Sequence, residues 1–236
     1  MNLVQSIRDG LPDDAMVAGG GLDPENGFLF PAEEALVVEA ATKRRREFLA
    51  GRSYARQALS RFGCAPAPIL AEPSRLPQWP PGFTGTISHS PSACAAIVAR
   101  TSIIAAIGLD IEDDAPLDDG IVPLVCREAD LDDRPVIERA LGADLPKLVF
   151  VVKEAFYKTY YPLTACFIDF ADVEVAIDPD SFRFEACLVN VERPSFNGQR
   201  RLSGSFGHVG TTLFALTFLH SCQSRSPGAV MRREGS

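Results

Sequence analysis

Residues 107–112 have the sequence Ile107-Gly108-Leu109-Asp110-Ile111-Glu112. They continue an aliphatic run, 103–107, that is typical of a buried β-strand. In an extended chain, side chains two residues apart point to the same face. We therefore expect Asp110 and Glu112 to project side by side, while Leu109 and Ile111 enter the core.

Two neighbouring carboxylates disfavour each other's ionisation unless a cation lies between them. Mg²⁺ meets this need, because it takes carboxylate oxygens and keeps several of its waters. The same pattern also fits an acidic strand end beside a solvated loop. Taken alone, Asp110 and Glu112 leave both interpretations open, and other parts of the chain have to separate them.

The composition is that of a soluble globular protein with one large domain or two small ones. The chain has 236 residues, of which 46% are hydrophobic and 23% are charged. A net charge of −8 argues against general nucleic-acid binding, which depends on a basic surface. No apolar run reaches transmembrane length, and the N-terminus lacks the apolar core of a secretory signal. The six cysteines are widely spaced, so we expect reduced thiols and a cytoplasmic protein.

Charge is segregated along the chain. Residues 43–61 hold seven basic side chains and one acidic one, whereas residues 109–133 hold ten acidic side chains and one basic one. A basic segment and an acidic segment together suggest a site that handles an anion and a metal. Two solvated faces would give the same distribution.

The basic segment is predicted to form a helix. After an irregular start broken at Gly19-Gly20-Gly21, a helical pattern runs from Pro31 to about Phe62. It carries a basic stripe with one further arginine at its edge, and guanidinium groups on one face can hold a phosphate. Exposed arginines on a solvated helix are the alternative. The stripe consists of Arg45, Arg52 and Arg56, with Arg44 beside it.

Two further pairs of residues are candidates for chemistry. Ser88 and His89 follow an extended segment, where a hydroxyl and an imidazole could bind a phosphate oxygen or simply form a turn. A second predicted helix runs from Lys147 to Tyr161 and ends before Pro162. Its Glu154 and Lys158 are neighbours on one face, either as catalytic groups or as a surface ion pair.

The last third of the chain predicts antiparallel strands at 173–177, 182–188, 202–206 and 212–219. Helices and antiparallel strands without a regular alternation favour an α+β fold. A short echo, Gly85–His89 and Gly204–His208, fits two similar halves. We predict an N-terminal half at 1–112, a C-terminal half at 113–220 and a flexible tail at 221–236.

The motifs occur in an order that resembles the Sfp-type 4′-phosphopantetheinyl transferases, and within them the enterobactin-synthase-type branch and its actinobacterial relatives. The resemblance covers roughly residues 30–220. It rests on the motifs Lys43-Arg44-Arg45-Arg46-Glu47-Phe48 with Arg52 and Arg56, Pro77-Gln78-Trp79-Pro80-Pro81-Gly82, Ser88-His89, Gly108-Leu109-Asp110-Ile111-Glu112, and Lys153-Glu154-Ala155-Phe156-Tyr157-Lys158.

The resemblance implies a pseudo-dimer of two α+β halves that binds coenzyme A in the cleft between them. It implies that Mg²⁺, or Mn²⁺ in its place, is bound by Asp110, Glu112 and Glu154. The 3′-phosphate of coenzyme A would be held by His89, Arg44 and Arg52, with Ser88 beside them and Arg75 near a basic phosphate-binding position. Lys153 and Lys158 would contact the other phosphates.

The implied reaction moves phosphopantetheine from coenzyme A to a serine of an apo acyl or peptidyl carrier protein and releases adenosine 3′,5′-bisphosphate. Glu154 would act as the general base and Lys158 would stabilise the leaving phosphate. The family implies a monomer that contacts its carrier through 121–143, in fatty-acid, polyketide, nonribosomal-peptide or siderophore synthesis. The alternatives are a non-catalytic binder of coenzyme A, a metal-dependent phosphohydrolase of a coenzyme-A-like diphosphate, and, more remotely, nucleic-acid binding through 43–61.

Overall fold

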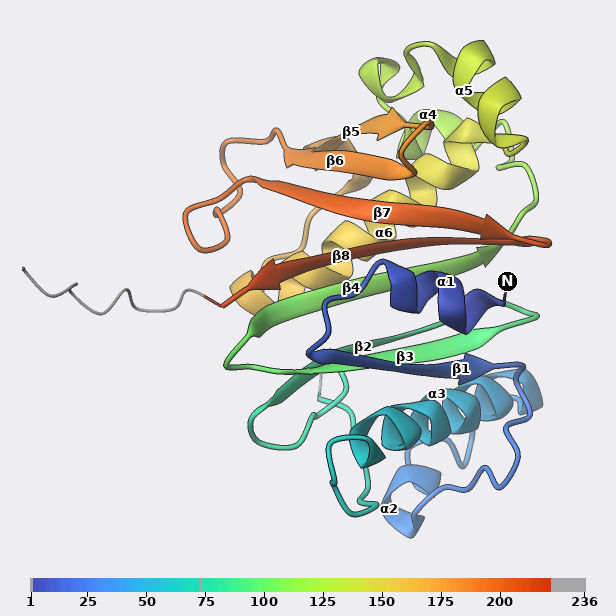
Figure 1. Ribbon diagram of the computed structural model, residues 1–236, viewed down its shortest axis with the longest axis vertical. Helices are drawn as coiled ribbons and strands as arrows, with labels where there is room; N and C mark the ends of the chain where they lie inside the picture. Colours follow the sequence, from blue (N-terminus) through green and yellow to red (C-terminus); the bar gives the residue numbers. More distant parts are fainter. Residues whose placement is uncertain (1, 73, 222–236) are drawn as a thin grey trace, which may run out of the picture.

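A computed structural model describes residues 2–72 and 74–221, and the statements below concern that range (Figure 1). The helices are α1 (Leu3–Asp9), α2 (Pro31–Glu34), α3 (Thr42–Ser60), α4 (Val122–Val125), α5 (Arg134–Leu141) and α6 (Leu145–Thr164), with 3₁₀ turns η1 (Glu128–Leu131) and η2 (Phe170–Asp172). The strands are β1 (Ala15–Gly20), β2 (Phe83–His89), β3 (Cys94–Arg100), β4 (Ile104–Asp113), β5 (Val173–Asp178), β6 (Arg183–Leu188), β7 (Arg201–Val209) and β8 (Thr212–His220).

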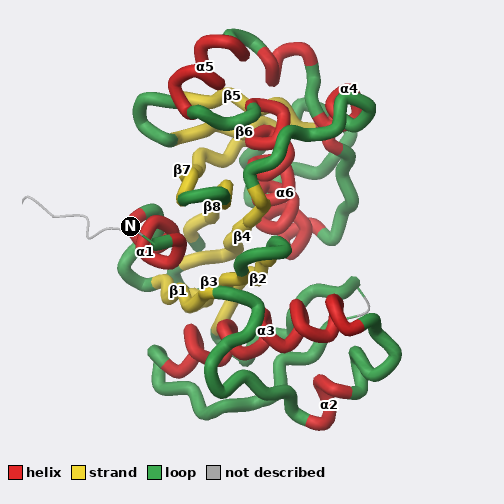
Figure 2. The backbone as a smooth tube through the Cα atoms, turned by 90° about the vertical axis from the view of Figure 1, so that its right-hand side faces the viewer, coloured by secondary structure: helices red, strands yellow, loops and turns green. Residues whose placement is uncertain are grey.

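Each long helix covers one antiparallel sheet. The strand order is β1-β3-β2 in the first sheet and β4-β8-β7-β6-β5 in the second. Helix α3 packs on the three-stranded sheet and α6 packs on the five-stranded one, so that the two helices lie on either side of the line where the sheets meet (Figures 1 and 2). The prediction of an α+β fold built from two similar halves is confirmed.

Strand β4 lies where the two halves meet. It pairs with β8 along its length, with Asp110 opposite Ala215. Leu109 and Ile111 are fully buried, as the alternation predicted, because they pack into the core between the two sheets. The predicted boundary at residue 112 falls near the end of β4, a strand of the five-stranded sheet. The division of the chain into domains at this residue stays a prediction.

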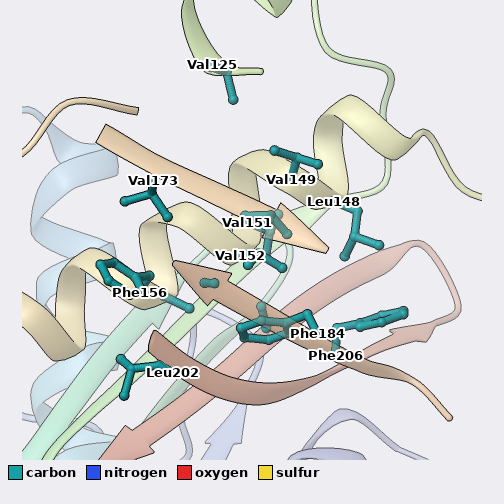
Figure 3. Packing of buried hydrophobic residues seen from close by; sticks show 14 of the residues in the cluster. Val125, Leu148, Val149, Val151, Val152, Phe156, Val173, Phe184, Leu202 and Phe206 are labelled. Atoms are coloured by element: carbon teal, nitrogen blue, oxygen red, sulfur yellow. The ribbon is translucent and has the colours of Figure 1, made fainter. Parts of the chain in front are cut away.

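Apolar packing on both sides of each sheet holds the halves together. The largest core fills the space between α6 and the five-stranded sheet, where Phe156, Phe184, Leu202 and Phe206 meet (Figure 3). A second core joins the two sheets beneath α1, and a third lies between α3 and the three-stranded sheet. Removal of this apolar surface from water is the main force that fixes the orientation of α6 and β4.

The helix expected from Pro31 to Phe62 is wrong in its extent, because the chain breaks between α2 and α3. The carboxylate of Glu33 is fully buried and accepts hydrogen bonds from the Arg56 guanidinium at 2.7 Å and from the Ile69 amide at 2.8 Å. These contacts fold α2 back onto α3. Propensity alone could not indicate this, since the partners are more than twenty residues away in sequence.

Two other boundaries also differ from the predictions. Gly19 and Gly20 belong to β1 and do not break it, since they pair with Ala95 and Cys94 of β3. Glycine is needed at position 19 because a Cβ there would come within 2.8 Å of the Ala95 Cβ. Pro162 lies inside α6, which continues to Thr164. The helix survives because Pro162 removes a single amide near its end and the preceding turns are held by the buried side chains of Phe156 and Tyr160.

Two further predictions concern membrane-spanning helices and the C-terminal tail. Within residues 2–72 and 74–221, no helix is long and apolar enough to cross a membrane. The flexible tail predicted at 221–236 lies, apart from Ser221, outside the described residues. Strand β7 ends one residue after His208, whose Nε2 lies 2.9 Å from Asp114 Oδ2.

Candidate active site

A cleft of about 710 Å³ follows the line where the two halves meet, and we refer to it as the seam cleft. Both halves contribute to its walls through α3, β2, β4 and α6. Its lining includes Arg44, Glu47, Arg52, Arg75, Ser88, His89, Asp110 and Lys158. The seam cleft thus brings together most of the residues that the sequence singled out.

Asp110 lies at the buried end of the cleft with one oxygen engaged and one free. Its side chain is 5% exposed as a residue, and Oδ1 accepts hydrogen bonds from Lys158 Nζ at 2.7 Å and from Ser88 Oγ at 3.0 Å. Oδ2 is buried and has no hydrogen-bond partner among the described residues. A buried carboxylate oxygen without a partner is costly, so this atom fits a site for a cation.

Glu112 points to the same side of β4, as predicted, and is held by a residue that the sequence analysis missed. Its Oε2 accepts a hydrogen bond from Lys147 Nζ at 2.9 Å. Lys147 lies in the first turn of α6, seven residues before Glu154 and eleven before Lys158. This spacing places the three side chains on one helical face and could have identified Lys147.

Glu154 completes a group of three carboxylates that influence one another. Burial raises the pKa of Glu154, the negative charge of Asp110 raises that pKa further, Lys158 lowers it, and Glu112 adds a smaller increase. Within the described part of the chain, no three such side chains stand in a metal-binding arrangement. The oxygen-only donor set and the unpartnered Asp110 Oδ2 nevertheless fit a hard divalent cation.

The other end of the cleft is cationic. Arg44 NH1 lies 3.4 Å from His89 Nε2, and both face the Glu47 carboxylate, at 3.8 Å and 3.7 Å respectively. Burial lowers the pKa of His89, while Glu47 raises it and Arg44 lowers it further. The Arg44 guanidinium donates hydrogen bonds, and the His89 ring donates one from whichever nitrogen is protonated, so together they suit an anion. Glu47 was not among the predicted site residues.

The basic stripe predicted on the helix is wrong as a single surface. Arg45 pairs with Glu34 at 3.0 Å, and Arg56 is buried against Glu33. Arg52 does line the cleft, but its Nε donates to the Ile69 carbonyl at 2.6 Å and burial lowers its pKa to about 10. The stripe is divided because α2 and the segment around Ile69 pack over its far side.

Ser88 and Arg75 also lie at the cleft, in different ways. Arg75 is exposed and lies at the rim. Ser88 is 3% exposed, and its hydroxyl donates to Asp110 while it accepts from the Ile111 amide at 3.0 Å and Lys158 Nζ at 3.1 Å. With these partners, Ser88 orders the carboxylate end and has little capacity left for a phosphate oxygen.

The predicted phosphate contact of Lys153 is wrong for this structure. Lys153 is 2% exposed, and its ammonium donates to Asp130 Oδ2 at 2.5 Å and to the carbonyls of Val125 and Phe170. These bonds use all three donors of the ammonium. Lys153 therefore ties α6 to the loops around α4 and η2, on the side of the helix away from the seam cleft.

A smaller pocket of about 140 Å³ lies beside Glu154. Its walls are mostly apolar and aromatic, and they come from α6 and the segment that follows it. They include Tyr157, Phe167, Ile168, Phe170 and Val173. Glu154 lines this pocket, whereas Asp110 and Lys158, whose charges act on the pKa of Glu154, line the seam cleft. A polar and an apolar surface in this arrangement suit a ligand with a charged part and an uncharged part.

A two-half α+β fold with a cleft that joins cationic and carboxylate ends defines a class of protein that comparison with known families can name. Residues 32–99 match the family model described as the 4′-phosphopantetheinyl transferase N-terminal domain, and residues 106–200 match that of the 4′-phosphopantetheinyl transferase superfamily. The chain belongs to the 4′-phosphopantetheinyl transferase family and is an enzyme of that family.

Individual relatives agree with this assignment. The chain is 37% identical over 186 residues to the 4′-phosphopantetheinyl transferase Svp of Streptomyces mobaraensis, with 78% of this chain and 75% of the relative covered. It is 34% identical over 160 residues to the transferase PptT of Mycobacterium tuberculosis, with 67% and 70% covered. The enterobactin synthase component D of Salmonella typhimurium is 33% identical over 141 residues, with 58% and 56% covered. The resemblance inferred from the sequence motifs is confirmed.

Proposed function

We propose that this enzyme transfers the 4′-phosphopantetheine group of coenzyme A to a serine hydroxyl of an apo acyl or peptidyl carrier protein, with Mg²⁺ required and adenosine 3′,5′-bisphosphate released. One observation carries the proposal beyond the family assignment. The seam cleft joins an end suited to an anion, at Arg44 and His89, to a carboxylate end whose buried Asp110 Oδ2 has no hydrogen-bond partner among residues 2–72 and 74–221.

The two ends fit the chemistry of coenzyme A. The 3′-phosphate would lie between Arg44 and His89, with Arg52 in the wall and Arg75 at the rim. The diphosphate would then approach Lys158 and Asp110. The uncharged pantetheine arm would continue past Glu154 into the apolar pocket. A mixed charged and apolar ligand of this kind would bury each part against matching surface.

Asp110, Glu112 and Glu154 are the residues that would hold Mg²⁺, or Mn²⁺ in its place. When bound, the metal would neutralise charge on the diphosphate oxygens. Lys158 and Lys147 already donate hydrogen bonds to Asp110 and Glu112. These hydrogen bonds hold each carboxylate toward α6, so that part of the donor set is ordered before a cation arrives.

The protein groups then perform the proton transfers. Glu154 would accept the proton of the carrier serine as the general base. The serine oxygen forms a bond to the β-phosphorus in line, while the bond from that phosphorus to the bridging oxygen breaks. Lys158 donates a hydrogen bond to the phosphate that leaves on adenosine 3′,5′-bisphosphate.

The proposal extends to partners in a limited way. We propose that the acceptor is a carrier of fatty-acid, polyketide, nonribosomal-peptide or siderophore synthesis and that it docks near α4 and α5, in 121–143. That the enzyme is a cytoplasmic monomer with no nucleic-acid or membrane partner stays a prediction from the sequence.

A panel of apo carriers from these pathways tests the proposal by intact mass after incubation with coenzyme A and Mg²⁺. We expect a mass gain of one phosphopantetheine on at least one carrier, abolished by a chelator. Glu154→Gln should still bind coenzyme A but lose about 10²–10⁴-fold in rate, the usual contribution of a general base. Glu185→Gln, at an exposed ion pair with Arg201, is the matched control and should keep wild-type activity.

The outcomes separate the alternatives. Coenzyme A binding with no transfer to any carrier would indicate a non-catalytic binder. Release of phosphopantetheine without carrier modification would indicate a phosphohydrolase. Normal turnover by Glu154→Gln would remove that residue from the role of base.

A further inference from the structure

Strands β2 and β4 lie side by side although they belong to different sheets (Figures 1 and 2). Each pairs through its backbone with another strand, β2 with β3 and β4 with β8. The edges that face each other are therefore joined by some other means. Their relative position matters, because β2 carries His89 and β4 carries Asp110 and Glu112.

Three hydroxyl side chains of β2 and its following turn, at positions i, i+2 and i+4, bridge this gap. Thr86 Oγ1 accepts from the Leu109 amide at 3.3 Å, Ser88 Oγ accepts from the Ile111 amide at 3.0 Å, and Ser90 Oγ donates to Asp113 Oδ1 at 2.6 Å. All three hydroxyl residues are buried. Thr86 and Ser88 substitute for a backbone ladder, because they satisfy two amides on the free edge of β4, and Ser90 holds the side chain of the last residue of that strand.

The last of these contacts is reinforced. Ser92 Oγ also donates to Asp113 Oδ1, at 2.6 Å, and Ser90 Oγ accepts from the amides of Ser92 and Ala93 at 3.2 Å. We refer to Asp113 with Ser90 and Ser92 as the clasp. Hydrogen bonds to a charged acceptor are the stronger kind, so the clasp fixes the turn that begins one residue after His89.

We propose that the clasp is a positioning element for coenzyme A: it sets the separation between the 3′-phosphate site at His89 and the carboxylate end at Asp110 and Glu112. This inference rests on the proposed function. A ligand anchored at two ends gains from the second anchor only when the two sites are held at the right spacing before it binds. Asp113 adjoins Glu112, and Ser90 adjoins His89, so the clasp ties β2 to β4 immediately beside both anchors.

The test compares coenzyme A with 3′-dephospho-coenzyme A, which lacks only the phosphate assigned to His89. Dissociation constants and KM values for both ligands are measured for the wild type, Ser90→Ala, Asp113→Ala and Asp113→Asn. Asp119→Ala is the control, because it removes an exposed carboxylate from the acidic segment 109–133 that also contains Asp113. We expect the wild type and the control to prefer coenzyme A equally.

The clasp variants should lose that preference. Ser90→Ala and Asp113→Ala are expected to reduce the preference about 10-fold or more, the effect of losing a hydrogen bond to a charged group. Their kinetics with the dephospho ligand should change little. Asp113→Asn should keep most of the preference, because its amide oxygen still accepts from the two serines. A purely structural loss would weaken both ligands alike.

The possible failures are distinguishable. A wild type that does not prefer coenzyme A would contradict the 3′-phosphate placement itself. A wild type with the preference, and folded Ser90→Ala and Asp113→Ala variants that retain it, would overturn the role of the clasp. Equal loss in Asp113→Asn and Asp113→Ala, with none in Ser90→Ala, would show that charge matters and the clasp does not. Should these variants fail to fold, Ser92→Ala removes only the more exposed hydrogen bond to Asp113. Its effect is measured by the same ratio of affinities for coenzyme A and 3′-dephospho-coenzyme A.

Discussion

At the scale of single residues, α6 shows how position separates chemically identical side chains. Lys153 and Lys158 are five residues apart, but the Lys153 side chain is 1% exposed against Asp130, whereas that of Lys158 is 28% exposed and reaches Asp110 in the cleft. Glu154 and Lys158 could be predicted from their spacing because both lie on the helical face toward β4. Lys153 could not, since its environment depends on loops more than twenty residues earlier in the sequence.

Lys153→Met should destabilise the fold and leave coenzyme A affinity unchanged. Removing one partner of a buried ion pair leaves Asp130 as an uncompensated charge, at a cost of about 3–5 kcal/mol. Urea unfolding measures the loss and calorimetric titration measures binding. Lys158→Met is the contrasting variant, with a smaller loss of stability and weaker binding. A stable Lys153→Met protein with impaired coenzyme A binding would restore the phosphate contact expected from the sequence.

At the scale of elements, the approach of β4 to α6 depends on Gly108. A Cβ at this position would come within 2.0 Å of the Ala155 carbonyl oxygen and 2.6 Å of Thr159 Oγ1. The strand can therefore lie against the helix only where a side chain is absent, which brings Asp110 next to Glu154 and Lys158. The sequence predicted the strand and the helix, but their close packing could not be predicted from either pattern alone.

Gly108→Ala should destabilise the protein by about 1–3 kcal/mol, the usual cost of forcing an extra methyl group into a packed interior. It should also reduce transfer activity, because the strand and the helix must separate. Gly21→Ala, where the added methyl group meets open space, is the control and should shift stability by no more than about 0.5 kcal/mol. Unfolding curves for the two variants decide the matter, and equal stability would show that α6 accommodates the methyl group freely.

At the scale of the whole molecule, the packing of the two halves along the seam cleft partly buries His89 beside Arg44. Burial is the main cause of the lowered pKa of His89, and Glu47 opposes it only in part. The unfolded chain, with a histidine pKa near 6.5, then binds a proton that the folded protein does not. The free energy of unfolding consequently falls as the pH drops below 6.5 toward the lowered pKa, and this contribution is fully retained above 6.5.

His89→Gln should remove this contribution, so that the free energy of unfolding varies less with pH between about pH 5 and pH 7. Urea denaturation of both proteins across that range provides the measurement. Coenzyme A should reduce the same dependence in the wild type, because an anion beside His89 favours its protonated form. Parallel stability curves for the two proteins would contradict the pKa direction given for His89.

The sequence by itself determined the two long helices in outline, most of the strands and the family to which the chain belongs. The alternation around Asp110 and Glu112 and the helical spacing of Glu154 and Lys158 involve residues close in sequence, so periodicity is enough to predict them. The order of the motifs along the chain identified the family. Only the tertiary structure decided which charged side chains face the cleft. It turned Arg56 and Lys153 inward, placed Lys147 and Glu47 in the site, and joined β2 to β4 through hydroxyl groups. Those outcomes depend on contacts between segments that are distant in sequence. A lysine or arginine is buried only where the fold supplies a carboxylate or carbonyl partner, as Asp130 does for Lys153, and otherwise it stays at the cleft surface.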